Sequence, residues 1–383
     1  MKIIKNKIIV ILIIIFSTIS FYGCWDYSEM EDFKHVAGIA VDRDKDKDEY
    51  IVTVEILETY PGSKQLKSHV VQSRDKIIHA AFRDAIKKIG NRLQLSHARV
   101  FIVSKDIARE GIVSAIDLIN RDVEVRNDMW IAVSKEDLAS EILTKSKSEQ
   151  EIISYDIEAA IKNSAKVGKY IGVETFKLTD TLLTEGVSPI LPMVKLAKKD
   201  GNMGFEVSET AVFKGDKIVG ELTERETMML QFFNGKDLEF IFPVDSDGNG
   251  TVSLEILGSK RDIKVNLNED KIVMNTYIDI DTAISELADS GINYINEEER
   301  NKLKNRAEEQ IKSDCNLLVE KLKKQYKSDI IGFGKELKKK KPQKWKKVSN
   351  NWDEIFESLD INISVNIDIK YSGLTRKNIE VKN

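Results

Sequence analysis

The segment LDINISVNIDIKY, residues 359–371, decides the fold because its side chains alternate strictly between apolar and polar. Apolar residues stand at every odd position, and Asp, Asn, Ser or Lys stands at every even position. Successive side chains of a β-strand point to opposite faces, so a period of two held this long indicates one buried face and one wet face. We therefore expect this segment to be a strand in a sheet that is covered on one side.

A long helix precedes this strand and is its natural cover. From Glu297 to Tyr326 the apolar residues recur at steps of three and four, which makes one stripe of a helix. Asn296 stands at the N-cap position, and Glu299 three residues later completes a capping box. Strand-like segments between 238 and 280 complete an expected antiparallel sheet with the helix on its apolar face. The stripe consists of Leu303, Ala307, Ile311, Cys315, Leu318 and Leu322.

The first half of the chain alternates strands with helices. Residues from Val36 to Glu58 predict a hairpin with a charged turn, and 74–90 predict an amphipathic helix. Strands expected at 95–103 and 127–134 flank a helix at 105–122. This spacing indicates a mixed sheet with helices packed on it, and hence a multi-domain α+β protein.

The domain boundaries follow from changes in composition. Residues 1–23 read as a signal peptide, and 24–200 form the first expected domain. The chain after this boundary ends in an expected C-terminal domain of sheet and long helix at 246–383. The segment 187–196 contains two prolines, so we expect it at a sheet edge or in a linker.

The N-terminus indicates export. Lysines at positions 2, 5 and 7 precede an apolar run that ends at Tyr22, which is short for a membrane span of about 20 residues. Gly23 stands at the −1 position of a lipoprotein cleavage site before Cys24, although Phe21 and Tyr22 are bulkier than usual there. Cleavage after Ser20 and an uncleaved anchor are the alternatives.

Cysteine usage favours a lipid on Cys24. The chain holds one other cysteine, Cys315, which lies on the apolar stripe of the long helix and reads as a small buried hydrophobe. Exported proteins that rely on disulfides carry cysteines in even, spaced sets, and this chain does not. We therefore expect a thioether-linked diacylglyceryl group on Cys24, whose two acyl chains give stable anchoring.

No enzyme signature occurs in the sequence. The net charge is −4, with 59 basic and 63 acidic residues, so no overall field favours nucleic acid. The chain lacks a nucleophile elbow, a P-loop and zinc-binding spacing, so we expect no catalytic residue, no metal site and no cofactor other than the lipid. The histidines, which we interpret as structural, are His35, His69, His79 and His97.

The stretch DSDGNGTVSLEI, residues 245–256, resembles the first two thirds of an EF-hand calcium loop. Its twelfth position holds Ile256 in place of a bidentate Glu, and its flanks are strand-like. A hairpin turn is the favoured interpretation, with weak calcium binding as the alternative. The candidate ligands are Asp245, Asp247, Asn249, Thr251 and Glu255.

A dense lysine segment, KKKKPQKWKK, occupies residues 338–347. It reads either as a solvated helix end or as a contact for anionic headgroups or a partner, whereas Trp345 and Trp352 are expected to anchor helices to the core. The possible contact residues are Lys338, Lys339, Lys340, Lys341, Lys344, Lys346 and Lys347.

The chain resembles the Ger(x)C family, the C-subunit lipoproteins of spore nutrient germinant receptors. The resemblance begins at GCWDYSEMEDFKHVAGIAVD (23–42) and continues through LSHARVFIVSKDIAREGI (95–112) and NRDVEVRNDMWIAVSK (120–135). The blocks SETAVFKGDKIVGELTERET (208–227) and DIIGFGKELKKKKPQKWKKVSNNWDEIF (329–356), with the alternating strand, complete it.

This resemblance implies a protein held by Cys24 on the outer face of the spore inner membrane. It implies assembly with a polytopic A subunit and a membrane B subunit, and it implies no catalytic residues. It also implies three α+β domains, of which a small middle domain is expected at 201–245. The implied role is mechanical or scaffolding. From the density of exposed charge, we expect partner contact on the wet face of the helix and sheet near Gly332 to Trp352. The alternative function is that of a solute-binding lipoprotein that captures a small germinant itself.

Overall fold

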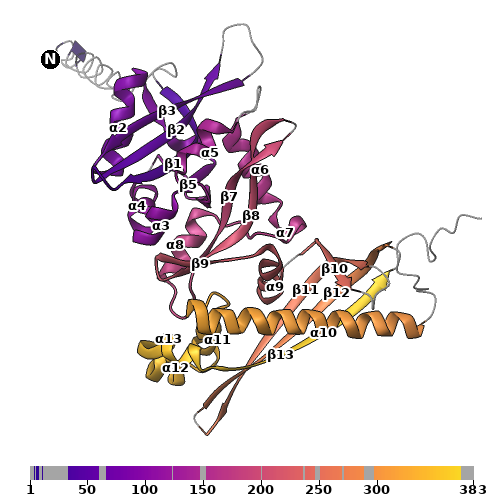
Figure 1. Ribbon diagram of the computed structural model, residues 1–383. Coiled ribbons are helices and arrows are strands. Elements are labelled where there is room, and N and C mark those ends of the chain that lie inside the picture. The colour runs from indigo at the N-terminus through magenta and orange to yellow at the C-terminus, as the bar shows by residue number, and fades with distance from the viewer. Residues whose placement is uncertain are drawn as a thin grey trace, which may run out of the picture.

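The protein consists of two β-sheets with helices packed on them (Figure 1). The computed structural model describes residues 33–371 apart from 60–65, 123, 147–151, 200, 236–237, 246–250, 270 and 289–296, with four isolated positions before residue 12. The expected α+β class with mixed sheets is confirmed.

The first sheet has the strand order β3-β2-β1-β5-β6-β7-β8-β9, and β4 pairs with β1 beside this path. The expected hairpin is confirmed, since β1 and β2 pair antiparallel, whereas β1, β5, β6 and β7 run parallel. The strands are β1 (Phe33–Asp44), β2 (Glu49–Thr59), β3 (Leu66–Asp75), β4 (Arg92–Gln94), β5 (Val100–Val103), β6 (Trp130–Ser134), β7 (Ile190–Lys199), β8 (Asn202–Lys214) and β9 (Lys217–Leu222).

Helices cover both faces of this sheet. Apolar side chains of α2, α3, α4 and α8 join one core cluster, and those of α5 and α6 join a second cluster on the other face. The expected helix at 105–122 is divided into α3 and α4 at Gly111. The helices are α2 (Ile78–Ile89), α3 (Lys105–Glu110), α4 (Val113–Arg121), α5 (Ser140–Lys145), α6 (Ile153–Lys162), α7 (Ser164–Val167) and α8 (Thr175–Leu183).

Two buried carboxylates fasten α5 and α6 to the strands beneath them. The Asp42 carboxylate accepts hydrogen bonds from the backbone N–H groups of Ala139 (2.5 Å) and Ser140 (3.0 Å). Glu55 accepts from the backbone N–H groups at the start of α6, at 3.0 and 2.9 Å. Carboxylates satisfy the free N–H groups of a first helical turn and interact favourably with its dipole. These two acidic residues therefore act as structural caps.

The proline-containing segment 187–196 is an inner strand, so its expected place at an edge or in a linker is wrong. Strand β7 lies between β6 and β8. Pro192 lacks an N–H donor, and the pairing of β7 with β6 begins one residue later, at Met193. On its other side, the pairing of β7 with β8 shifts register between Pro192 and Met193. Proline is tolerated at such irregularities because the ladder does not need its N–H donor there.

The second sheet has the order β10-β11-β12-β13, with β10 (Ile241–Asp245), β11 (Thr251–Asn268), β12 (Lys271–Ala288) and β13 (Asp360–Tyr371). Strand β13 pairs parallel with β12, so the expectation of a wholly antiparallel sheet is wrong at this pair. Parallel neighbours need a crossover connection, which residues 289–359 provide.

The long helix covers this sheet as expected. Helix α10 (Glu297–Lys321) lies across the strands in Figure 1 and continues into a π-turn (Leu322–Tyr326). All six residues of its apolar stripe are buried, and Ile363 and Ile367 of β13 belong to the same core cluster. The N-cap predicted at Asn296 lies outside the described residues.

Residues 201–245 contribute to both sheets. Strands β8 and β9 complete the first sheet, whereas β10 begins the second. Helix α9 (Glu224–Asn234) starts with the capping box of Thr223 and Glu226 and packs its phenylalanines into the core of the second sheet. The domain boundaries at 200 and 245 stay a prediction.

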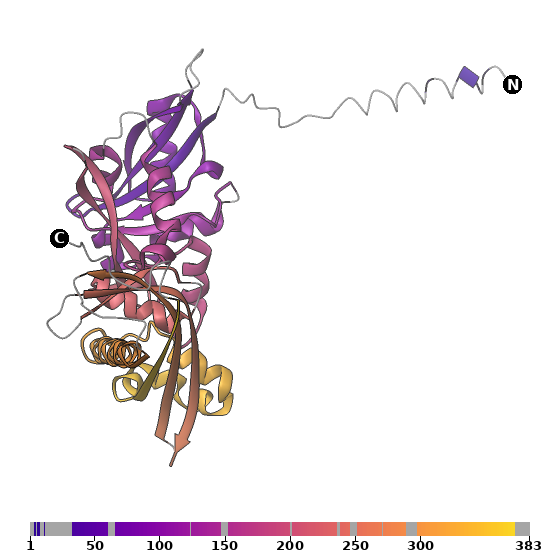
Figure 2. The same cartoon turned by 90° about the vertical axis from the view of Figure 1, so that its right-hand side faces the viewer.

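A C-terminal helical cluster follows the π-turn and comprises α11 (Phe333–Lys340), α12 (Pro342–Val348), a 3₁₀ turn (Ser349–Asn351) and α13 (Trp352–Glu357). Trp345 and Trp352 are buried with ring centroids 5.4 Å apart, so their predicted role as core anchors is confirmed. Figures 1 and 2 place this cluster at the opposite end of the molecule from β1, β2 and β3.

The helical cluster touches the first sheet's connecting loop through two glycines. Gly186 has a φ of +76°, and a Cβ added there would lie 2.5 Å from the carbonyl carbon of Gly334. The Lys335 N–H donates to the Gly186 carbonyl at 2.9 Å. Only glycine permits backbones to approach this closely, so this contact sets the position of the helical cluster.

We expect Gly186→Ala to loosen the helical cluster, because the new methyl group meets backbone atoms of α11. Gly201→Ala is the matched control, since Gly201 has a similar φ of +84° and nothing within 4 Å of an added Cβ. Both variants carry the strain of a left-handed alanine, about 1 kcal/mol. Only Gly186→Ala should show faster protease cleavage between 327 and 357, and equal cleavage in both variants would contradict this account.

Candidate interaction site in the C-terminal helical cluster

The Asp329 carboxylate organises the start of the helical cluster. It accepts hydrogen bonds from the backbone N–H groups of Gly332 (2.8 Å), Phe333 (3.1 Å) and Gly334 (2.8 Å). The indole N–H of Trp352 donates to the same carboxylate at 3.1 Å, which ties α13 to the first turn of α11. One buried side chain thus holds two helices of the cluster.

Burial raises the pKa of Asp329 to about 6 from its usual 3.8, although the four N–H donors act in the opposite direction. Asp329 is 4 % exposed, and a buried carboxylate without hydrogen-bond partners would be costly. The local sequence carries one signal for this arrangement, because glycines three and five positions after the Asp allow a tight turn around its side chain. Our sequence interpretation did not identify Asp329.

Backbone contacts fasten the same segment to the first sheet. The Ser188 N–H donates to the Asp329 carbonyl at 2.8 Å, and the Ser328 hydroxyl donates to the carbonyl of Phe213 in β8 at 2.5 Å. These groups are separated by more than 100 residues in the sequence, so no local pattern could reveal their proximity. They make the base of the cluster part of the protein's core.

The lysine segment 338–347 divides into a bound part and a free part. The Lys338 ammonium lies 3.1 Å from the Glu185 carboxylate, and Lys340 lies 3.2 Å from Asp262. The Trp345 N–H and Lys338 lower the pKa of Glu185. The four lysines that are exposed and have no ion-pair partner within the described residues are Lys339, Lys341, Lys346 and Lys347. Lys344 is half-buried.

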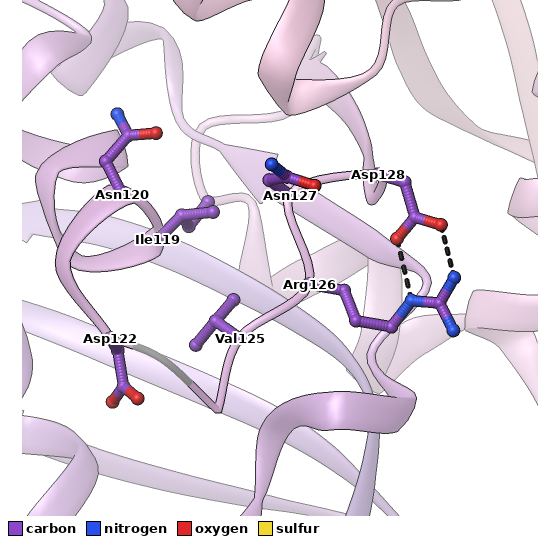
Figure 3. Close-up of a pocket in the computed structure, with 7 residues that line it drawn as sticks. All are labelled: Ile119, Asn120, Asp122, Val125, Arg126, Asn127 and Asp128. Atoms are coloured by element: carbon purple, nitrogen blue, oxygen red, sulfur yellow. Dashed lines mark hydrogen bonds and ion pairs between the residues drawn. The ribbon is translucent and has the colours of Figure 1, made fainter.

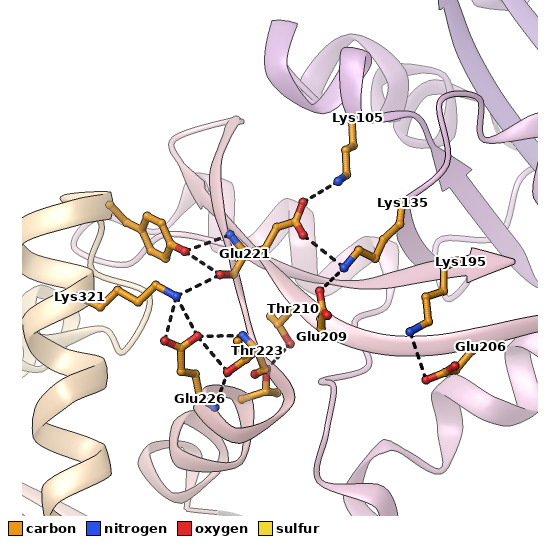
Figure 4. A network of polar contacts seen from close by, with 12 residues as sticks. Lys105, Lys135, Lys195, Glu206, Glu209, Thr210, Glu221, Thr223, Glu226 and Lys321 are labelled. Carbon is orange, nitrogen blue, oxygen red and sulfur yellow. Dashed lines mark hydrogen bonds and ion pairs between the residues drawn. The ribbon is translucent and has the colours of Figure 1, made fainter. Parts of the chain in front are cut away.

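A network of charged side chains lies where the first sheet meets α10 (Figure 4). Glu221 of β9 binds Lys105 at 2.7 Å and Lys135 at 3.5 Å. Burial acts to raise the pKa of Glu221, but these ammonium groups outweigh it and hold that pKa below its usual range. Lys135 also pairs with Glu209, a bulge residue with a φ of +61°. The network carries balanced charge, which indicates a structural junction.

The π-turn after α10 closes against this network. The Tyr326 hydroxyl donates to the Glu221 carbonyl at 2.6 Å, and its ring packs so closely that a Cβ on Gly220 would lie 2.0 Å from a ring carbon. Lys321 binds Glu226 at 2.8 Å, which joins α10 to the capping box of α9. Sequence reasoning missed this junction, since its members come from six separate elements and from the loop after β6.

The calcium-loop candidates do not form a site in the described part of the chain. Asp245 and Thr251 pair with each other at the end of the β10–β11 ladder, whereas Asp247 and Asn249 lie outside the described residues. Glu255 pairs with Ile241, four residues further along the ladder. The flanking elements are strands, as in the hairpin interpretation, and calcium binding stays an untested prediction.

The structure describes the surroundings of Cys315 but not those of Cys24. Cys24 lies outside the described residues, so its lipidation stays a prediction. Cys315 is buried on α10, and burial raises the pKa of its thiol. Among the described helices, none combines the length and the apolar content that crossing a membrane requires.

The described residues contain no group of three or more His, Cys, Asp and Glu side chains arranged to hold a metal ion. A hollow of about 400 Å³ lies between the end of α4 and the loop before β6 (Figure 3). Two of its charged side chains, Arg126 and Asp128, bind each other, and the Asp122 carboxylate accepts the backbone N–H of Glu124. The charged groups that line this hollow are therefore engaged within the protein.

Comparisons with known proteins cover nearly the whole chain. The family model described as "Spore germination protein N-terminal domain" matches residues 26–196, and the model "Spore germination B3/ GerAC like, C-terminal" matches 208–373. Spore germination protein B3 of Bacillus subtilis is 23% identical over 95% of this chain and 98% of its own length. Spore germination protein GerQC of Bacillus cereus is 22% identical over 83% and 87%.

A solved structure shares the fold. The crystal structure of the GerBC protein superposes with a TM-score of 0.54, covering 87% of this chain and 96% of that one, at 20% sequence identity. At this identity the likeness concerns the arrangement of helices and strands.

We expect the stability that Asp329 confers to depend on pH. Its pKa of about 6 in the folded state exceeds the usual 3.8, so the folded state holds this proton more tightly. The resulting stabilisation is full below pH 4 and is lost as the pH rises through 6. The unfolding free energy of the wild type minus that of Asp329→Asn should fall by on the order of 3 kcal/mol between pH 4 and 7.

Urea unfolding followed by tryptophan fluorescence measures this difference, because Trp352 is bonded to Asp329. Asp353→Asn is the control, since Asp353 is an exposed partner of Lys214 in the same cluster and such pairs contribute little. A wild-type minus Asp329→Asn difference that is flat or rises with pH would show that the assigned titration is wrong.

Proposed function

We propose, because this chain belongs to the Ger(x)C family of spore germination proteins, that it is a non-enzymatic subunit of a spore nutrient germinant receptor. The observation that carries the proposal is the ordered match of both family models, which together span 26–196 and 208–373. In this role the protein is attached to the spore inner membrane by a diacylglyceryl group on Cys24. It assembles there with the A and B membrane subunits.

The activity we propose is assembly and signal transmission. The contacts described above support this, because the two sheets are joined by buried hydrogen bonds and a balanced ionic network. Such a connection lets a force or a displacement at one end of the molecule reach the other end. The proposal assigns no catalytic residue and no resident metal.

The partner contact we propose is the free part of the lysine segment. Its four exposed lysines lie on α11, on α12 and at the junction between them, and Trp345 of α12 is fixed in the core. Figures 1 and 2 place these helices away from β1, the strand that follows Cys24 in the sequence. A protein surface with complementary negative charge therefore fits this segment better than the bilayer that holds Cys24.

Charge reversal of the free lysines should weaken receptor assembly. Lys339, Lys341, Lys346 and Lys347 would be changed together to Glu, so that attraction becomes repulsion at the contact. Co-purification of the A and B subunits from spore inner membranes should fall by about tenfold or more.

The control for this experiment is an equal reversal elsewhere, at exposed lysines on β7, β9, β11 and α10. Both variants should retain the wild-type melting temperature, because exposed charges contribute little to stability. Normal assembly of the first variant would exclude the lysine segment as the partner contact. The control positions are Lys198, Lys217, Lys260 and Lys312.

The N-terminal peptide of the mature protein tests the anchor. Mass spectrometry should find Cys24 as the first residue, carrying a diacylglyceryl group. Cys24→Ala should release the protein from the membrane fraction, since the two acyl chains supply its stable anchoring. An unmodified N-terminus that begins after Ser20 would overturn the lipid attachment and leave the family membership unaffected.

A further inference from the structure

A groove with an apolar floor opens between α2, β4 and the end of α4 on the first sheet. It encloses about 400 Å³, and its floor is made by Phe82, Ile86, Leu93 and Leu95. Phe82 and Leu95 are buried, whereas Ile86 and Leu93 are partly exposed to the groove. Helices α2 and α4 lie near each other on the left of Figure 1. The groove is distinct from the lysine segment and from the polar junction.

One wall of the groove carries unneutralised positive charge. Arg83 of α2 and Arg92 of β4 are exposed, and no carboxylate pairs with either of them among the residues that the structure describes. Arg92 stacks over the ring of Phe33 at 5.5 Å, which holds its guanidinium group at the rim. His79 lies on the same wall. Guanidinium groups match the geometry of phosphate oxygens and bind them with charge-assisted hydrogen bonds.

The opposite wall differs in charge. Arg121 is held by Asp117 through hydrogen bonds of 2.8 and 2.7 Å, so it is neutralised locally. Asp122 and Glu124 supply negative charge there, and Asp122 accepts the backbone N–H of Glu124 at 2.9 Å. An anion entering the groove would therefore be drawn to the wall of α2 and β4. This asymmetry gives a bound ligand a defined orientation.

The groove lies where the chain leaves its anchor. Phe33 pairs with Arg92 in the parallel ladder of β1 and β4, and it follows Cys24 by nine positions. Nine residues reach at most about 30 Å when fully extended. If Cys24 carries a lipid, the groove is tethered within that distance of the bilayer surface. This step rests on the anchor that we proposed above.

We propose that this groove binds the phosphodiester headgroup of an anionic membrane phospholipid. Arg83 and Arg92 donate to the phosphate oxygens, and the apolar floor packs against the glycerol backbone and the first carbons of the acyl chains. Binding at this site fixes the first sheet against the membrane. The C-terminal helical cluster, at the other end of the molecule, then faces away from it.

The test is a titration of the full chain, purified in detergent, with phosphatidylglycerol, and retained lipid is counted by native mass spectrometry. The variant Arg83→Gln/Arg92→Gln should bind this lipid more weakly, by about fivefold for each arginine removed. The control variant Lys198→Gln/Lys217→Gln removes the same charge from exposed positions on β7 and β9, which do not line this groove, and should bind like the wild type.

The single variant Arg83→Gln guards against a folding defect, because Arg92 packs on Phe33 whereas Arg83 is exposed on α2. It should weaken lipid binding about fivefold. Equal retention in all variants would overturn the proposal. So would displacement of the lipid by inorganic phosphate at similar concentration, which would indicate a site for a free anion. If the purified Arg83→Gln/Arg92→Gln chain binds the lipid normally but no longer co-purifies with the A and B subunits from spore membranes, protein docking replaces lipid binding as the role of this groove.

The lipid in this titration is added freely, so the outcome does not depend on modification of Cys24. Release of the protein from the membrane fraction reports failure of the anchor instead. The two proposals can therefore fail separately.

Discussion

The apolar face of the second sheet has to be removed from water, and α10 is the element that covers it. The buried stripe of the helix meets side chains such as Ile363 and Ile367 of β13 in one core cluster. Each such side chain contributes about 1.5–3 kcal/mol when it is fully buried. Because β13 runs parallel to β12, the chain must cross the sheet before β13 can form. The helices from Glu297 to Glu357 are therefore part of one crossover.

That crossover also joins the two sheets. Where α10 ends, Tyr326 packs on Gly220 and binds the backbone of Glu221, so the helix terminates against the first sheet. Three residues later, Asp329 gathers the first turn of α11 and Trp352. The same covering requirement thus positions the helical cluster. Loss of the α10 contact would release the cluster as well as expose the sheet.

The sequence predicted the parts of the fold that depend on local period. The alternation in 359–371 identified β13, and the stripe identified α10, because each pattern records which side chains are buried. The same period of two arises in parallel and antiparallel strands, so the pairing of β13 with β12 could not be read from it. Likewise, the two prolines of 187–196 indicated an edge or a linker, whereas a register shift admits Pro192 to the inner strand β7.

The candidate site was predictable only in part, for a related reason. The lysines and tryptophans of 338–352 were visible as a composition, and the tryptophans proved to be core residues. Which lysines are free depends on partners such as Glu185 and Asp262, which lie 153 and 78 positions away. Asp329 has local donors, but its significance comes from burial, which is a property of the assembled fold.

The arrangement of charge along the molecule constrains how such a protein can act. The α2 and β4 wall of the groove and the free lysines of 339–347 are both basic, and they lie at opposite ends (Figures 1 and 2). Between them, the charges of the polar junction are paired with each other, so the middle of the molecule presents little net field. A membrane that attracts one end leaves the other end free for an acidic partner. A rigid middle is then required, since a flexible one would let both basic ends settle on the same surface.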